Sequence, residues 1–216
     1  MAEVGFFDVL RSQRGIRRYA PDPVSDATVR QVIEAATWAP SGSNRQPWHF
    51  IVIRDAEIKR RLGEIYREGM IASGGGKAPV PSTLQPGVPP LFSDNLATVP
   101  VVVMVCLEKW PTRGRDNLLG AHIFPAVQNL MLAAAALGLG TRLTTIWQHK
   151  DTDVMDLLGI PDTVETMAMI PLGYPGGDEH LGGGKRKPVE DVIHSERWLF
   201  CVRLPLLVLM VSSKNK

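Results

Sequence analysis

Paired arginines near the N-terminus are the first side chains in this sequence with an evident chemistry. The segment QRGIRR at residues 13–18 follows a predicted helix, so Arg14 and Arg17 could lie on one side of an irregular turn. Two guanidinium groups placed in this way suit a bidentate grip on a phosphate. Cations are also expected at the C-terminal end of a helix, and the segment alone favours that structural interpretation.

A second segment, APSGSNRQPW at residues 39–48, places hydroxyls, an amide and a glycine between a predicted helix and a predicted strand. Backbone N–H groups freed by Gly42, together with the side chains of Ser41, Ser43 and Asn44, suit a ligand rich in oxygen and ring-nitrogen acceptors. The alternative is an ordinary turn. Function is favoured because two prolines stiffen the segment and because aromatic residues at its end anchor it in the core.

A third segment, GGGKRKP at residues 182–188, joins three glycines to three consecutive cations. Such a chain could close over an anion, with Lys185 and Lys187 supplying positive charge. Taken alone, it indicates a charged run on the surface.

Composition excludes several other functions. The net charge is only +2, from 24 basic and 22 acidic residues, so no global field directs the chain to nucleic acid or to anionic membranes. The 216 residues are 44% hydrophobic, which fits one domain with one core. The two cysteines form no disulfide framework, and the N-terminus lacks the basic segment and apolar stretch of a signal peptide. A cytoplasmic protein is therefore expected.

Familiar nucleotide-binding and catalytic motifs each lack a required residue. A phosphate loop needs Ser or Thr after its lysine, but alanine follows Lys77 and arginine follows Lys185. The GLG run at residues 138–140 precedes a strand, whereas a dinucleotide fingerprint opens a helix. Ser41 lacks the G-x-S-x-G context of a nucleophile elbow, and the five histidines show no metal-ligand spacing.

Hydrophobic periodicity predicts an α+β sheet protein. Helices are predicted at residues 6–10, between Ser25 and Pro40, around Ile58–Ile65, at Phe124–Leu137 and at Asp153–Leu158. Strands are predicted at Trp48–Ile53, Val99–Cys106, Arg142–Ile146 and Thr166–Leu172. The first two strands are expected to be buried, and Val99–Cys106 to be central, because it is almost continuously apolar.

Glycine and proline dominate residues 69–98 and predict a long loop or lid. Loops of this length in a compact domain are usually functional or disordered. The residues leave both possibilities open.

Together these segments resemble the nitroreductase family of FMN-dependent NAD(P)H oxidoreductases, in compatible order from Phe6 to Trp198. The resemblance is carried by QRGIRRY at residues 13–19 with PDPV at 21–24, AATWAPSGSNRQPW at 35–48, LGLGT at 137–141, IPLGYP at 170–175 and KPVEDVIH at 187–194. Residues 35–48 are the most specific of these. The resemblance implies one FMN-binding domain at residues 1–198. The tail at residues 199–216 continues past the point where relatives end, and its apolar residues leave two interpretations open, packing against a partner subunit or a reading-frame oddity.

By similarity, the fold is an α/β sandwich whose central, mostly antiparallel sheet is flanked by helices, and two subunits form a homodimer with two shared FMN sites. The resemblance implies that FMN is held by Arg14, Gly15, Ile16, Arg17, Lys185 and Lys187, with Thr144, Thr145 and Ile146 along its ring. Loop residues would reach the cofactor from the other subunit, namely Pro40, Ser41, Gly42, Ser43 and Asn44, with Gln46 in support. Many relatives carry serine in place of Gly15, so backbone contacts would replace one side-chain hydrogen bond there.

The resemblance also implies the reaction. NADH or NADPH would deliver a hydride to flavin N5 and leave before an electron-poor small molecule, such as a nitroaromatic or a quinone, takes the electrons. The flavin carries the chemistry, so no catalytic side chain and no metal are needed. Arg17 would stabilise the anionic reduced flavin. An Arg17→Ala variant should then have a lowered flavin midpoint potential. The alternative is a flavin-binding relative without turnover, or one that fragments its own FMN in cobalamin-ligand synthesis.

Overall fold

The computed structural model describes residues 5–74, 96–110 and 117–198 of the chain. The chain divides into two compact units, residues 1–183 and residues 184–216, and each is described by itself. The second unit contributes one described element, the short 3-10 helix η5 (Val189–Asp191). All other described elements belong to the first unit.

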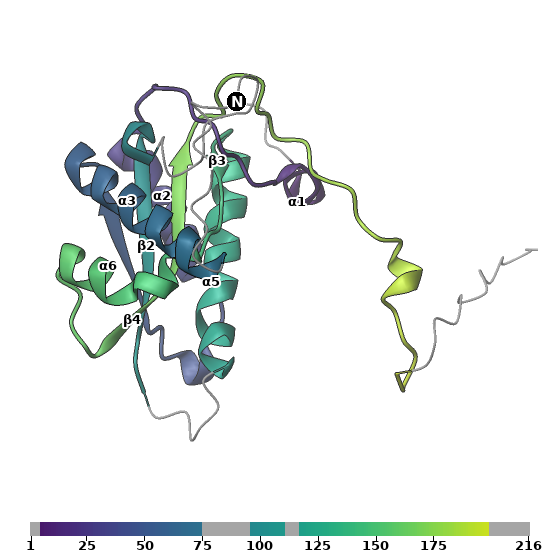
Figure 1. Cartoon of the computed structure of the whole chain (residues 1–216). Coiled ribbons are helices and arrows are strands. Elements are labelled where there is room, and N and C mark those ends of the chain that lie inside the picture. The colour runs from purple at the N-terminus through teal and green to yellow at the C-terminus, as the bar shows by residue number, and fades with distance from the viewer. Residues whose placement is uncertain (1–4, 75–95, 111–116, 199–216) are drawn as a thin grey trace, which may run out of the picture. The chain divides into compact units, whose positions relative to one another are not determined.

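The first unit is built on a four-stranded antiparallel sheet with the strand order β1-β2-β4-β3 (Figure 1). Its strands are β1 (Trp48–Ile53), β2 (Val101–Glu108), β3 (Gly140–Thr141) and β4 (Val164–Gly173). β2 lies between β1 and β4, and all of its residues except Glu108 are buried. The predicted α+β fold and the central place of the apolar strand are confirmed.

Helices cover both faces of this sheet (Figure 1). The helices of this unit are α1 (Phe6–Ser12), α2 (Asp26–Thr37), α3 (Ala56–Ser73), α5 (Asn117–Ala136) and α6 (Asp151–Leu158), with the 3-10 helices η1 (Gly42–Asn44), η3 (Leu96–Thr98) and η4 (Ile146–Lys150). α1 lies to the side of the sheet (Figure 1). Successive residues of a strand point to opposite faces. Val103 and Val105 therefore pack with α2 and α5, whereas Met104 and Cys106 pack with α3, η4 and α6.

Helix α5 is the most apolar helix of the first unit. The stretch Leu118–Ala136 is long enough and apolar enough to cross a membrane, judged by length and composition alone. The core helix of a soluble protein meets the same two criteria. Ile123, Val127 and Leu130 have no exposed surface, because they pack in the core with the strands. The helix begins seven residues before the predicted Phe124, and Pro125 lies inside it.

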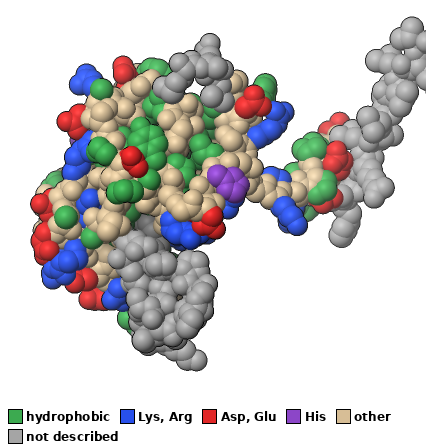
Figure 2. Space-filling view, turned by 90° about the horizontal axis from the view of Figure 1, so that it is seen from above, with side chains coloured by type: hydrophobic (Ala, Val, Ile, Leu, Met, Phe, Trp, Pro, Cys, Tyr) green, Lys and Arg blue, Asp and Glu red, His purple; other side chains and the backbone are tan. Residues whose placement is uncertain are grey.

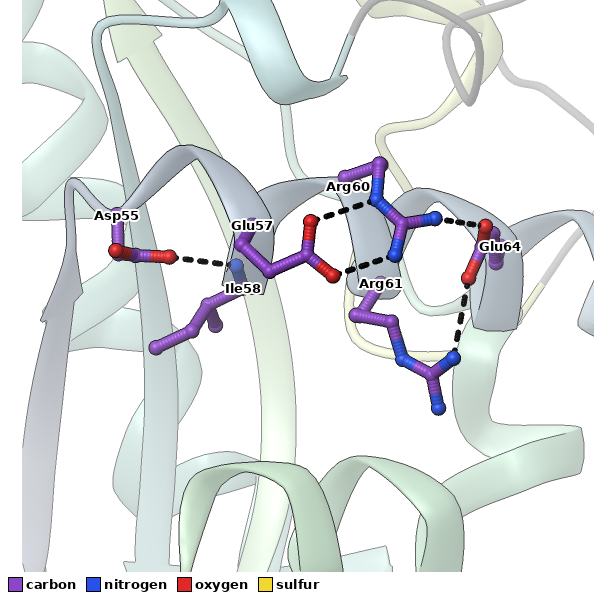
Figure 3. Close-up of polar contacts among 6 residues, drawn as sticks. All are labelled: Asp55, Glu57, Ile58, Arg60, Arg61 and Glu64. Carbon is purple, nitrogen blue, oxygen red and sulfur yellow. Dashed lines mark hydrogen bonds and ion pairs between the residues drawn. The ribbon is translucent and has the colours of Figure 1, made fainter.

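Helix α3 begins at a side-chain cap. Oδ1 of Asp55 accepts the backbone N–H of Ile58 at 2.8 Å, which satisfies a donor that the first turn of a helix leaves open. Farther along, Arg60 bridges Glu57 and Glu64 on the outer side of the helix (Figure 3). Exposed ion pairs add little stability, so the cap and the buried side of the helix fix its position.

Several predicted bounds agree with the structure to within two residues. Ser25 caps α2, because its Oγ accepts the N–H of Thr28 at 3.1 Å, and Gly159 ends α6 with a φ of 64°. β1 has the predicted bounds Trp48–Ile53. The prediction that β1 is buried was wrong, because β1 lies at the edge of the sheet and Val52 is 40% exposed.

The prediction of a loop or lid at residues 69–98 was partly wrong. α3 continues to Ser73 and η3 covers Leu96–Thr98, while residues 75–95 lie outside the described residues. At Gly69, inside α3, an added Cβ would lie 2.4 Å from the carbonyl oxygen of Ile146. This glycine allows α3 to pack closely against η4 and does not interrupt the helix.

The strand predicted at Arg142–Ile146 was also wrong. β3 comprises Gly140 and Thr141, and the chain after it makes a single antiparallel bridge, between Thr144 and Met169. It then enters η4 at Ile146. The β-branched residues Thr144, Thr145 and Ile146 gave this range its strand-like composition.

A buried chain of hydrogen bonds ties η4 and α6 to β4. The indole N–H of Trp147 donates to the hydroxyl oxygen of Thr166 at 3.2 Å, and that hydroxyl donates to the carboxylate of Asp151. Trp147 has no exposed surface and Thr166 is 4% exposed, so water does not replace these partners.

Replacing Thr166 with valine should lower the free energy of unfolding by about 1–3 kcal/mol, because the Trp147 N–H and the Asp151 carboxylate each lose a buried partner. Urea unfolding measures this loss. Thr166→Ser keeps the hydroxyl and should recover most of the stability, and Thr163→Val at an exposed position should change it by less than about 0.5 kcal/mol. A Thr166→Val variant as stable as the parent protein would contradict this account.

Candidate functional site

The arginine segment lies beside the short strand β3. Gly15 forms a parallel bridge with Thr141, and the N–H of Ile16 donates to the carbonyl oxygen of Thr141 at 2.9 Å. The Ile16 side chain is fully buried against Gly140, where an added Cβ would lie 2.6 Å from Cγ1 of Ile16. The backbone of the segment is therefore held on the edge of the sheet.

Tyr19 closes the turn that follows. Its hydroxyl donates to the carbonyl oxygen of Ile16 at 2.8 Å and lies 3.4 Å from that of Pro171. Burial raises the pKa of Tyr19 well above its ordinary value, so the hydroxyl keeps its proton and remains a donor. Both backbone groups of Ile16 thus have partners within the fold, and its predicted contact with a cofactor stays a prediction.

Arg14 and Arg17 carry charges that no carboxylate of the described residues neutralises. Arg14 is half-buried and Arg17 is exposed, and neither forms an ion pair within the described part of the chain. Arg18, in contrast, pairs with Asp178. Two unpaired guanidinium groups on a fixed backbone suit a phosphate, which carries nearly two negative charges at neutral pH.

The segment Thr144–Ile146 lies at the same end of the sheet, directly after β3. Thr144 exchanges backbone hydrogen bonds with Met169 of β4, at 3.2 and 3.1 Å, and its hydroxyl lies 3.1 Å from that of Tyr66. The N–H of Thr144 is therefore occupied, which leaves Thr145 and Ile146 to supply the predicted backbone contact with a flavin ring. A single copy of the chain thus brings together two of the predicted cofactor segments.

The loop at residues 40–46 has a strained backbone. Ser43, Asn44 and Gln46 have φ values of 54°, 53° and 52°, in the left-handed region that favours glycine. The loop closes on itself, because the N–H of Gln46 donates to Ser41 Oγ at 2.9 Å and the Gln46 side chain donates to Asn44 Oδ1 at 3.2 Å. Clustered left-handed residues other than glycine are typical of functional sites.

Gly42 contacts a residue that the sequence did not assign to this loop. Its N–H donates to Nδ1 of His122 on α5 at 3.0 Å. The expectation that Gly42 frees N–H groups for a ligand does not hold for its own N–H, and its cofactor role stays a prediction. His122 lies 80 positions away from Gly42 in the sequence. The only pattern sought among the histidines was metal-ligand spacing, so nothing in the sequence indicated this contact.

The arginine segment and the loop at residues 40–46 lie apart within the chain. Gln13 contacts Met131 of α5, with Nε2 3.9 Å from the sulfur, whereas the loop contacts α5 at His122. Nine residues along a helix separate these contacts by about 14 Å. The loop leads into β1 beside the C-terminal end of β2, whereas β3 pairs with the C-terminal end of β4, at the opposite end of the sheet.

Lys185 and Lys187 belong to the second unit. Both side chains are exposed, and neither forms an ion pair with a residue that the structure describes. Their predicted contribution to an anion site stays a prediction.

Uncovered apolar surface lies near both candidate segments. Phe6 and Phe7 of α1 are each 67% exposed, Trp38 before the loop is 75% exposed, and Leu118 and Phe124 of α5 are 44% and 39% exposed. Figure 2, which views the molecule from above Figure 1, shows hydrophobic side chains in the middle of that face and charged side chains around its edge. Grooves of about 550 and 440 Å³, along α2 and between α3 and α6, include none of the predicted cofactor residues.

Known proteins share this sequence pattern and fold. The sequence model described as Nitroreductase family matches residues 10–174. An Archaeoglobus fulgidus protein, whose name gives an inferred NADH dehydrogenase/NAD(P)H nitroreductase activity, is 26% identical over 192 residues, or 88% of this chain and 97% of that protein.

Two solved structures share the fold. Oxidized iodotyrosine deiodinase bound to FMN and 3-iodo-L-tyrosine has a TM-score of 0.72 at 21% identity, over 90% of this chain and 100% of that one. NADPH:FMN oxidoreductase from Vibrio harveyi complexed with NAD+ has a TM-score of 0.70 at 20% identity, over 90% of this chain and 78% of that one.

Replacing Ser43 with glycine should raise the free energy of unfolding of the unliganded protein by about 0.5–1 kcal/mol, because glycine adopts a positive φ without the steric cost of a Cβ. Ser43→Ala keeps the Cβ and is the matched control, with an expected change of less than about 0.5 kcal/mol. Urea unfolding compares the two variants. Equal stability of the two would show that the loop is not strained at this position.

Proposed function

Since the chain belongs to the nitroreductase family, we propose that it is an FMN-dependent oxidoreductase that takes electrons from NADH or NADPH and gives them to an electron-poor small molecule. The observation that carries this proposal is the pair of unneutralised arginines, Arg14 and Arg17, on a backbone fixed beside Thr141. The names of the relatives support it, since one is an NADPH:FMN oxidoreductase and another binds FMN.

The donor set around β3 fits FMN. Arg14 and Arg17 would bind the phosphate or the polar edge of the ring, because each presents charged N–H groups that no described carboxylate occupies. Thr145 and Ile146, which are half-buried, would lie along the flat ring. Lys185 and Lys187 would add positive charge at the phosphate.

We further propose that each FMN site is shared between two copies of the chain. The loop at residues 40–46 lies about 14 Å along α5 from the arginine segment, so a second copy would bring its own loop to the site. The exposed side chains Phe6, Phe7 and Phe124 support a partner surface, because large apolar groups next to a candidate site are typical of interfaces. A twofold-symmetric dimer would contain two such sites.

When bound, FMN supplies the acceptor and donor of hydride or electrons. The protein binds and orients it and excludes water. Arg17 would stabilise negative charge that develops on the polar edge of the ring, because it is a cation carried by a backbone that is fixed beside β3. Tyr19 keeps that backbone in position through its hydrogen bond to Ile16.

The proposed order of events is ping-pong, in which the nicotinamide donor leaves before the acceptor enters the same face of the site. Nitroaromatics and quinones are the acceptors that a broad, flat site of this kind would accommodate. A flavin-binding or FMN-fragmenting protein remains the alternative, and the reduction experiment separates these functions.

Purified protein should be yellow, with an FMN absorption spectrum and close to one flavin per chain. Anaerobic mixing with NADH or NADPH should bleach the flavin rapidly, and a quinone or nitroaromatic should restore the colour. Bound flavin that neither donor reduces would favour the alternative, and a colourless protein that refuses added FMN would exclude the proposed function.

Complementation between two inactive variants tests the shared site. The chain with Arg14→Ala and Arg17→Ala, and the chain with Ser41→Ala and Asn44→Ala, should each bind little FMN. After joint unfolding and refolding at equal concentrations, about one quarter of all sites should be restored, because half of the dimers are mixed and each contains one intact site.

Native mass spectrometry provides the control for complementation, because it counts the mixed dimers directly. Mixed dimers that remain free of FMN would contradict a site shared between subunits. Restoration in the absence of mixed dimers would contradict it equally.

A further inference from the structure

His122 of α5 lies outside every segment that the proposed function assigns to FMN, yet it contacts one of them. Its Nδ1 accepts the N–H of Gly42 at 3.0 Å. We propose that His122 is a positioning residue, which holds the loop at residues 40–46 in the conformation that receives FMN. This role rests on the function proposed above.

The imidazole and Gly42 fit closely. A Cβ on Gly42 would lie 2.3 Å from Cε1 of His122, closer than real Cβ atoms come, and 3.0 Å from Nδ1. The φ of Gly42 is not positive, so glycine is needed here for the approach of the ring and not for its backbone freedom. Nδ1 can accept only in a neutral ring that carries its proton on Nε2.

Trp110, which follows β2, connects the two anchors of the loop. Its ring meets that of His122 edge to face, with 4.6 Å between centroids. The guanidinium of Arg45 lies over the same indole, 5.1 Å from the ring centroid, in a cation–π contact. His122 therefore holds the loop at Gly42, and Trp110 holds it at Arg45.

These two anchors flank two of the three strained residues of the loop. Ser43 and Asn44, with φ values of 54° and 53°, lie between Gly42 and Arg45. Left-handed residues other than glycine cost free energy of the same order as one hydrogen bond contributes. Loss of one anchor should therefore let the loop relax, and the side chains of Ser43 and Asn44 would lose the positions from which they reach a ligand.

The test compares His122→Phe, which removes the acceptor but keeps a ring against Trp110, with His122→Asn, whose amide oxygen replaces Nδ1 as acceptor. The dissociation constant for FMN of the apoprotein is measured by quenching of flavin fluorescence. It should rise about tenfold in His122→Phe and stay within about threefold of the parent value in His122→Asn. His180→Phe, which removes an exposed imidazole elsewhere, is the control and should leave the constant unchanged.

Hydrogen exchange of the Gly42 amide, followed by NMR without FMN, provides a readout that depends on the anchor alone. Exchange should be faster in His122→Phe than in the parent protein and close to the parent rate in His122→Asn. Gly42→Ala approaches the contact from the other side, because its Cβ collides with the imidazole, and should weaken FMN binding even if His122→Phe does not fold.

Unchanged FMN affinity and unchanged Gly42 exchange in His122→Phe would overturn the proposal. A loss of affinity that His122→Asn shares would overturn it as well, since packing and not the hydrogen bond would then be responsible. If the parent protein itself binds no FMN, the proposed function fails, and the positioning role toward FMN fails with it. Gly42 exchange in the variants then shows separately whether His122 anchors the loop.

Discussion

One backbone pairing fixes the arginine segment, on which the proposed anion site depends: the hydrogen bond from the N–H of Ile16 to the carbonyl oxygen of Thr141. Thr141 pairs at the same time with Leu172 of β4, so the arginine segment is joined to the central strands through β3, and Tyr19 adds a bridge to Pro175 just after β4. Binding an anion to an unsupported loop would be opposed by the entropy of ordering its backbone. In this protein the backbone of the arginine segment is ordered when the chain folds. Binding an anion then requires ordering of the arginine side chains only, so the affinity depends on them.

The loop at residues 40–46 has the opposite character, since its backbone is strained and its position depends on side chains from other elements. Its internal hydrogen bonds close the turn but do not attach it to the sheet. Attachment comes from His122 on α5 and from Trp110 in the segment after β2. A strained and externally anchored loop is well suited to a contact between subunits, because a partner surface can select the one conformation that the anchors already favour.

Periodicity predicted those elements whose burial follows one regular pattern. β2 is buried on both faces and α2 on one, so an apolar run and a three-and-four spacing were sufficient. The failures lie where tertiary contacts decide. Residues 142–146 have strand-like composition, but only Thr144 finds a partner on β4 before the chain enters η4. The edge position of β1 depends on what lies beside it, which a local pattern does not contain.

Glycine shows most clearly why the site could be predicted only in part. The sequence marks Gly42, Gly69 and Gly140 equally, and each was interpreted locally: Gly42 as a source of free N–H groups, Gly69 as the start of a loop and Gly140 as part of a glycine run before a strand. In the structure all three permit close approach, to His122, to the backbone of Ile146 and to Ile16. A glycine in a sequence indicates that space is needed, but not whether a turn, a neighbouring helix or a side chain fills it. Gly42 could therefore be assigned to a functional loop from the sequence, whereas its partner His122 could be found only in the folded chain.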